Sequence, residues 1–169
     1  MAANWRTILW QQFGAAIDML DNALLACPDE LWGDRSEKPE FWYVVFHTLF
    51  FLDLYLSGSS EGFAPPAPFT MDELDPAGVL PERVYPKDEL HPYLKHCRQK
   101  CRATIEALTD ERAVQVARFW DWNWEISFLE LLLYNMRHVQ EHSAQLSLIL
   151  GQKIGWEAPW VSEARTGDG

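Results

Sequence analysis

Two histidines of this 169-residue chain have the spacing of metal ligands, in the stretch SFLELLLYNMRHVQEHSAQLSLILG. His138 and His142 are four positions apart, so on a helix they project from one side and can hold one divalent ion. A third histidine, His47, lies in the apolar stretch FWYVVFHTLFFLDLYL, where a histidine is costly unless it is hydrogen-bonded or ligated. The structural alternatives are two surface or core histidines, and for His47 a core histidine bonded to a backbone carbonyl or a tyrosine.

Three neutral imidazoles with open coordination positions are typical of a catalytic rather than a structural metal site. Imidazoles bind several divalent metals with little selectivity, and we expect zinc or nickel here, with iron or manganese as alternatives. Ligating histidines usually donate their second N–H to an acceptor. The neighbouring polar residues Tyr43, Asn135 and Gln145 are therefore candidates for the pocket or for contacts with the outer side of the histidines.

Four segments carry apolar residues at spacings of three and four, which predicts helices at 4–26, 39–56, 87–108 and 127–151. Ser127 and Glu130 have capping-box spacing, and Gly151 is placed to end the last helix. Pro39 is placed to open the second helix. Residues 57–86 are rich in proline and glycine and read as a long crossover. The pattern predicts one all-α domain over residues 1–169, a four-helix bundle with a disordered tail at 165–169.

Composition limits the classes of partner. The net charge of −11 opposes binding to nucleic acid or anionic lipid. No apolar run reaches the length of a membrane span, and no signal peptide is recognisable. Three cysteines fit a reducing cytoplasm better than a disulfide framework. Cys97 and Cys101 follow an apolar stripe and are interpreted as core residues, with a thiolate metal pair as the alternative.

Two further segments leave questions open. The sequence FWDWNWE alternates three tryptophans, which indicates an extended segment with one aromatic face. That face either closes the end of the bundle or forms a pocket wall. The segment HVQEH also matches the H-x-x-E-H signature of inverted zinc proteases, with Glu141 as the base. That fold needs a distant acidic third ligand, for which the short sequence after His142 offers little room.

The arrangement of FWYVVFHTLFFLDLYL followed far downstream by ELLLYNMRHVQEHSAQL resembles the DinB-like (YfiT-like) superfamily. The most specific element of the resemblance is H-x-x-x-H with a glutamine three residues later, matched by His138, His142 and Gln145. The resemblance implies an up-down-down-up bundle, often dimeric, with His47, His138 and His142 on a divalent metal. Ser143 and Ala144 depart from the residues that many relatives carry, which bears on substrate class more than on metal binding.

Characterised members of that family include transferases and isomerases that use low-molecular-weight thiols. The leading hypothesis is therefore a metal-dependent transferase or hydrolase in the cytoplasm. It would act on a small molecule, with or without a thiol, as a homodimer that binds neither nucleic acid nor membrane. The alternative from another class is a non-catalytic bundle that binds a metal or a small molecule in a stress response.

Overall fold

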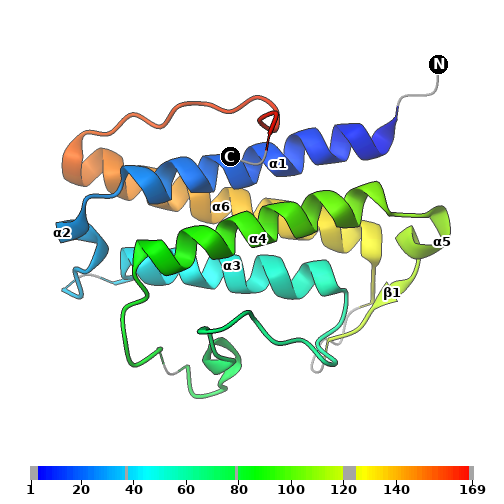
Figure 1. Cartoon of the computed structure of the whole chain (residues 1–169), viewed down its shortest axis with the longest axis horizontal. Helices are drawn as coiled ribbons and strands as arrows, with labels where there is room; N and C mark the ends of the chain where they lie inside the picture. The colour runs from blue at the N-terminus through cyan, green and yellow to red at the C-terminus, as the bar shows by residue number, and fades with distance from the viewer. Residues whose placement is uncertain (1–3, 37, 79, 120–124, 168–169) are drawn as a thin grey trace.

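Helices account for most of the chain in the computed structural model, which describes residues 4–36, 38–78, 80–119 and 125–167 (Figure 1). The prediction of an all-α protein is confirmed, and the described residues add one short pair of strands. The helices are α1 (Trp5–Ala26), α2 (Asp29–Trp32), α3 (Phe41–Ser57), the 3-10 turn η1 (Asp72–Leu74), α4 (Lys87–Glu106), α5 (Asp110–Ala113) and α6 (Phe128–Ile154). Strand β1 (Val116–Ala117) pairs antiparallel with β2 (Ile126–Ser127).

The four long helices lie side by side around one apolar core (Figure 1). Helices α1 and α3 each pack against both α4 and α6. Residues 58–86, here named the crossover segment, lead from the end of α3 back along the molecule to the start of α4 (Figure 1). Burial of the apolar side chains between these helices provides the main driving force for the fold.

Helix α6 begins as the capping pattern predicts but ends later. The Ser127 hydroxyl accepts a hydrogen bond from the backbone N–H of Glu130, at 3.3 Å. The predicted stop at Gly151 is wrong, because Gly151 lies inside the helix and the left-handed residue that ends it is Gly155, at φ +68°. That conformation suits glycine, which has no Cβ to clash with the following carbonyl.

Helix α3 begins two residues after the predicted position. Pro39 precedes the helix instead of opening it, and the N-cap residue is Glu40, in an extended conformation. The buried Glu40 carboxylate accepts hydrogen bonds from the Trp42 indole at 2.6 Å and from Arg35 at 3.1 Å. These bonds hold Glu40 outside the helical region, so the first helical residue is Phe41.

The C-terminal residues contact a buried ion pair between α1 and α4. The side chains of Asp18 on α1 and Arg98 on α4 form a buried ion pair, with Nε and Oδ1 2.8 Å apart. Asp18 also accepts the Arg165 backbone N–H at 2.7 Å, and Arg98 donates to the carbonyls of Arg165 and Gly167. These bonds tie the backbone of residues 165 and 167 to the ion pair, and residues 168–169 lie outside the described part, so disorder of the tail from residue 165 stays a prediction.

The structure bears to different extents on the predictions for the tryptophan segment, for membrane spans and for the two cysteines of α4. Residues 120–124, with Trp120, Trp122 and Trp124, lie outside the described residues, so the role of that segment stays a prediction. Within the described part of the chain, we find no helix with both the length and the apolar character to cross a membrane. The prediction that Cys97 and Cys101 are core residues is confirmed, since both are fully buried on α4.

Replacing both core thiols tests their structural role. Burial raises the pKa of both thiols, so they stay protonated. We expect Cys97→Ala with Cys101→Ala to lower the free energy of unfolding by roughly 1–3 kcal/mol, the cost of a modest core truncation. Urea denaturation measures the loss. Zinc affinity should not change, and a lower zinc affinity of the folded variant would contradict the assignment.

Candidate metal centre

The three histidines singled out by spacing come together in the folded chain. His47 lies on α3, and His138 and His142 lie one turn apart on α6, which packs against α3. One ligand atom from each histidine lies within 4.8 Å of the others. The Nε2 atoms of His47 and His138 are 3.3 Å apart, and the ring centres of His138 and His142 are 4.6 Å apart. The packing of α3 on α6 therefore joins residues that are 91 positions apart in sequence.

The pattern of burial along α3 explains how His47 reaches this place. Of the residues of this helix, only Tyr43, His47, Phe51 and Ser57 are not buried. The first three recur every four residues, so they form one half-buried stripe on a helix that is otherwise enclosed. The His47 ring contacts both α6 histidines, with ring centres 5.3 Å from His138 and 4.9 Å from His142. The site thus lies along the seam between α3 and α6, at the accessible edge of α3.

The outer nitrogens of two of the rings have acceptors. Nδ1 of His47 bonds the Glu73 carboxylate, and Nδ1 of His142 lies 2.9 Å from the Gln145 amide oxygen. Nδ1 of His138 is buried with no hydrogen-bond partner among the described residues. In His47 and His142 these contacts leave Nε2 as the nitrogen for a ligand. Two Nδ1 atoms with acceptors, beside a close pair of Nε2 atoms from His47 and His138, fit a divalent ion bound by imidazoles.

The protonation states also suit a metal. Burial, with the nearby His142 and His47, lowers the pKa of His138 to about 3. Burial likewise lowers the pKa of His142, although the bond to Gln145 acts in the opposite direction. Near neutral pH both rings are therefore uncharged, which is the form that coordinates a metal.

Aromatic side chains form one wall of the site. The Phe51 ring lies 4.9 Å from that of His47 and 5.9 Å from that of His138, and the Tyr55 ring lies 6.1 Å from that of His138. This wall limits the contact of water with the inner side of the histidines. The His47 side chain is nevertheless 27% exposed, so solvent reaches this histidine.

The other three candidate residues, Tyr43, Asn135 and Gln145, differ in how they contact the histidines. Gln145 touches His142 directly. The Tyr43 hydroxyl donates to Glu73 at 3.1 Å and so reaches His47 through that carboxylate. Asn135 is fully buried and donates to the Leu52 carbonyl at 3.0 Å, while its own carbonyl oxygen has no partner among the described residues.

Glu73 is the contact that reasoning from the sequence missed. It belongs to η1 in the crossover segment, which was read only as a connection. No spacing rule relates a loop glutamate to a histidine 26 positions earlier. The protease signature gains no support, because Glu141 is exposed and the described part of the chain adds no acidic residue to the histidine cluster.

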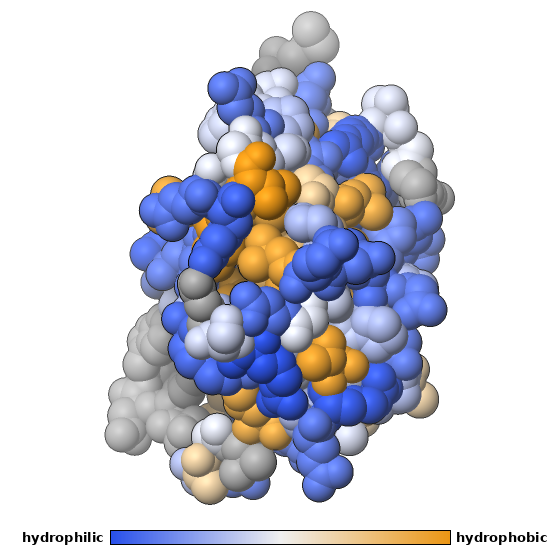
Figure 2. Space-filling model, turned by 90° about the vertical axis from the view of Figure 1, so that its left-hand side faces the viewer, coloured by the Kyte–Doolittle hydropathy of each residue, from blue (hydrophilic) through white to orange (hydrophobic). Residues whose placement is uncertain are grey.

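A surface hollow lies at the α2 end of the molecule, and Gln145, which contacts His142, is part of its lining. It lies between α2, the start of α3 and the last turns of α6, and its lining includes Leu31, Phe41, Gln145, Leu148 and Ile149. Figure 2 views this end, where apolar side chains gather in the middle and hydrophilic side chains surround them. We name this feature the α2 hollow. Gln145 joins it to the histidine cluster, since that side chain both lines the hollow and bonds His142.

Comparison with known proteins identifies the family. The model of the DinB superfamily matches residues 12–146, a span that includes the three histidines and Gln145. Searches of the curated proteins and of the solved structures gave no match. The family match covers well over half of the chain, and it agrees with the resemblance carried by the histidine motifs. The chain therefore belongs to the DinB superfamily.

Proposed function

We propose that this protein is an enzyme that depends on a divalent metal bound by His47, His138 and His142. The observation that carries the proposal is the convergence of one ligand atom from each histidine within 4.8 Å, from two helices far apart in sequence. Three neutral imidazoles leave coordination positions for water or substrate. The contacts of α1 and α3 with α4 and α6 support an up-down-down-up four-helix bundle as the scaffold.

Each part of the site has a role in this proposal. A bound ion of this kind polarises a carbonyl or lowers the pKa of a coordinated water, and zinc or nickel suits the donor set. Glu73 and Gln145 orient the rings of His47 and His142 through Nδ1. Phe51 and Tyr55 shield the inner side of the site from water.

The substrate in this proposal is a small molecule that enters by the α2 hollow. Leu148 and Phe41 offer apolar contacts in that hollow, and Gln145 offers a polar group beside His142. Charged side chains, among them Asp34 and Lys153, also line the hollow, so it offers a small molecule both apolar and polar contacts. The reaction class that we propose is a thiol-dependent transfer or a hydrolysis, for which the support is membership of the DinB superfamily.

His47→Gln tests whether α3 and α6 share one ion. We expect zinc affinity to fall about tenfold or more, because one of three ligands is lost. The helical fold should persist, because glutamine keeps a hydrogen-bonding group at this half-buried position. Competition with a chromophoric chelator measures the affinity, and circular dichroism checks the fold. Unchanged zinc affinity in a destabilised variant would remove His47 from the site. Zinc-dependent turnover of a thiol with an electrophile then tests the reaction class.

A further inference from the structure

In the described part of the chain, Glu73 is the one carboxylate that we find hydrogen-bonded to the histidine cluster, and it comes from outside the four long helices. We propose that Glu73 is a positioning residue for His47: its carboxylate accepts the Nδ1–H and directs Nε2 to the metal. This inference rests on the proposed metal site and adds a residue that sets its affinity. The crossover segment would then contribute a side chain to the metal site.

The burial of Glu73 supports this role. Its side chain is 4% exposed, although it lies in a loop between proline-rich stretches. A buried carboxylate is costly unless hydrogen bonds or an opposite charge compensate it. The partners that the structure gives Glu73 are Nδ1 of His47 and the hydroxyl of Tyr43, and both contact the same atom, Oε1. The burial of this carboxylate is therefore compensated at the histidine that we assign to the metal.

The local backbone holds Glu73 in place. Within η1 and its flanks, the Leu74 N–H donates to the Met71 carbonyl at 2.9 Å, and Asp75 donates to the Asp72 carbonyl at 2.9 Å. The Thr70 hydroxyl donates to the Asp72 carboxylate at 2.6 Å. These bonds form a closed turn that presents one side chain to α3. Glu73 thus reaches His47 from a defined turn rather than from an open loop.

The three rings differ in their outer partners, and that difference predicts which ligand matters most. His47 has an anionic acceptor and His142 has a neutral amide. Hydrogen bonds to a charged group are roughly twice as strong as those between neutral groups. A carboxylate on Nδ1–H also increases the electron density at Nε2, which makes the ring a better donor to a cation. His47 should therefore be the most strongly donating ligand of the three.

Glu73 acts through His47 and not as a ligand in this geometry. The cluster of possible ligand atoms within 4.8 Å of one another consists of the three histidines, and no carboxylate oxygen of the described residues belongs to it. The Glu73 oxygen engages the outer side of the His47 ring, opposite the nitrogen that faces His138. The geometry matches a carboxylate–histidine–metal arrangement.

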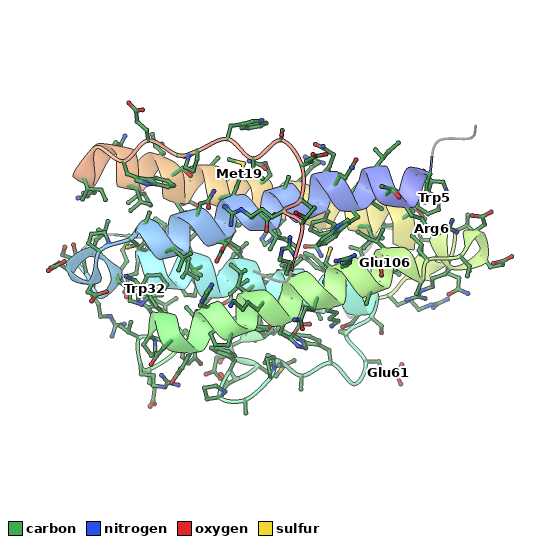
Figure 3. All side chains as sticks on the ribbon, turned by 45° about the horizontal axis from the view of Figure 1, so that its top comes forward. Trp5, Arg6, Met19, Trp32, Glu61 and Glu106 are labelled. Atoms are coloured by element: carbon green, nitrogen blue, oxygen red, sulfur yellow. The ribbon has the colours of Figure 1, made fainter. Side chains whose placement is uncertain are left out.

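The test uses untagged, full-length protein carrying Glu73→Gln, which keeps the shape and an acceptor oxygen but removes the charge. Glu73→Ala removes both. The matched control is Glu61→Gln, because Glu61 is exposed in the same crossover segment and its side chain projects away from the helices (Figure 3). Zinc affinity is measured by chelator competition. In zinc-loaded, 15N-labelled protein, NMR follows the Nδ1–H proton of His47, assigned by its loss in His47→Gln.

We expect Glu73→Gln to weaken zinc binding about tenfold, and Glu73→Ala at least as much, as changes behind a metal ligand do. The His47 Nδ1–H resonance should move upfield in Glu73→Gln, because its acceptor is no longer charged. Glu61→Gln should match the wild type in both. A Glu73→Gln protein with wild-type zinc affinity, or with an unmoved His47 resonance, overturns the inference.

The same measurements separate this inference from the proposed function. If the wild type binds zinc but Glu73→Gln binds it equally well, only the positioning role fails. In that case a lower thermal stability of the zinc-free variant would show that Glu73 merely fastens the crossover segment. If the wild type binds no divalent metal, the proposed function and this inference both fail.

Discussion

Replacing His138 and His142 together by alanine is expected to abolish the binding of about one zinc ion per chain. The change leaves His47 as the single histidine of the cluster, and one imidazole does not hold an ion against dialysis. The double variant should also lose the thermal stabilisation that zinc gives the wild type. An ion bound only by the folded state adds about 2.7 kcal/mol at a hundredfold excess over Kd. Elemental analysis of untagged, reconstituted protein and zinc-dependent melting curves measure both effects.

The chain provides a matched control for this experiment. His91 and His96 lie on one helix, α4, and neither belongs to the cluster. His91→Ala with His96→Ala removes the same number of histidines and should retain full zinc stoichiometry. Some loss of stability is expected from the contact of His91 with Asp21, at 3.1 Å. Equal zinc retention by both double variants would refute the assigned ligands.

Arg98→Met is expected to lower the free energy of unfolding by about 3–5 kcal/mol, the largest stability effect that we predict. Arg98 neutralises the buried Asp18 carboxylate through two nitrogens, with Nε–Oδ1 at 2.8 Å and Nη2–Oδ2 at 3.4 Å. Methionine leaves that charge buried without its cationic partner, although the Arg165 N–H still donates to it, and also frees the carbonyls of Arg165 and Gly167. Urea denaturation monitored by circular dichroism gives the difference.

An exposed ion pair on the same helix serves as the comparison. Arg102 pairs with Glu106 at 2.8 Å, and both side chains are exposed. Arg102→Met should therefore cost less than about 1 kcal/mol. The combined variant Asp18→Leu with Arg98→Met removes both charges and should recover much of the loss, since apolar replacements of buried pairs are often tolerated. A small effect of Arg98→Met alone would contradict the importance of this pair.

The sequence predicts much of the site because helical periodicity is local. The spacing of His138 and His142 places both on one side of α6 whatever surrounds that helix, and Gln145 follows on the next turn. His47 could be singled out from the sequence because it interrupts an otherwise apolar helix. The residues that it contacts could not be predicted, because they depend on how α3 packs. The meeting of Glu73 with His47 depends on the path of the crossover segment, and no pattern within that segment encodes it.

The errors at helix ends have a similar origin. Gly151 and Gly155 are both plausible stops, and the choice between them depends on which backbone enters the left-handed region. Pro39 has the conformation to open a helix, but the bonds that Glu40 makes with Trp42 and Arg35 displace the start. Local propensity allows either outcome in each case, and at Glu40 the side-chain contacts formed in the folded chain decide.

The histidine cluster and the Asp18–Arg98 pair lie on different seams between helices. The histidines join α3 to α6, whereas Asp18 and Arg98 join α1 to α4. Effects at sites that share no partners usually add. Natural variation at the α1–α4 seam can therefore change how long the protein survives heat or proteolysis while the proposed metal site stays unchanged. Selection for stability would then change residues of α1 and α4, and selection on the histidine site would change residues of α3 and α6.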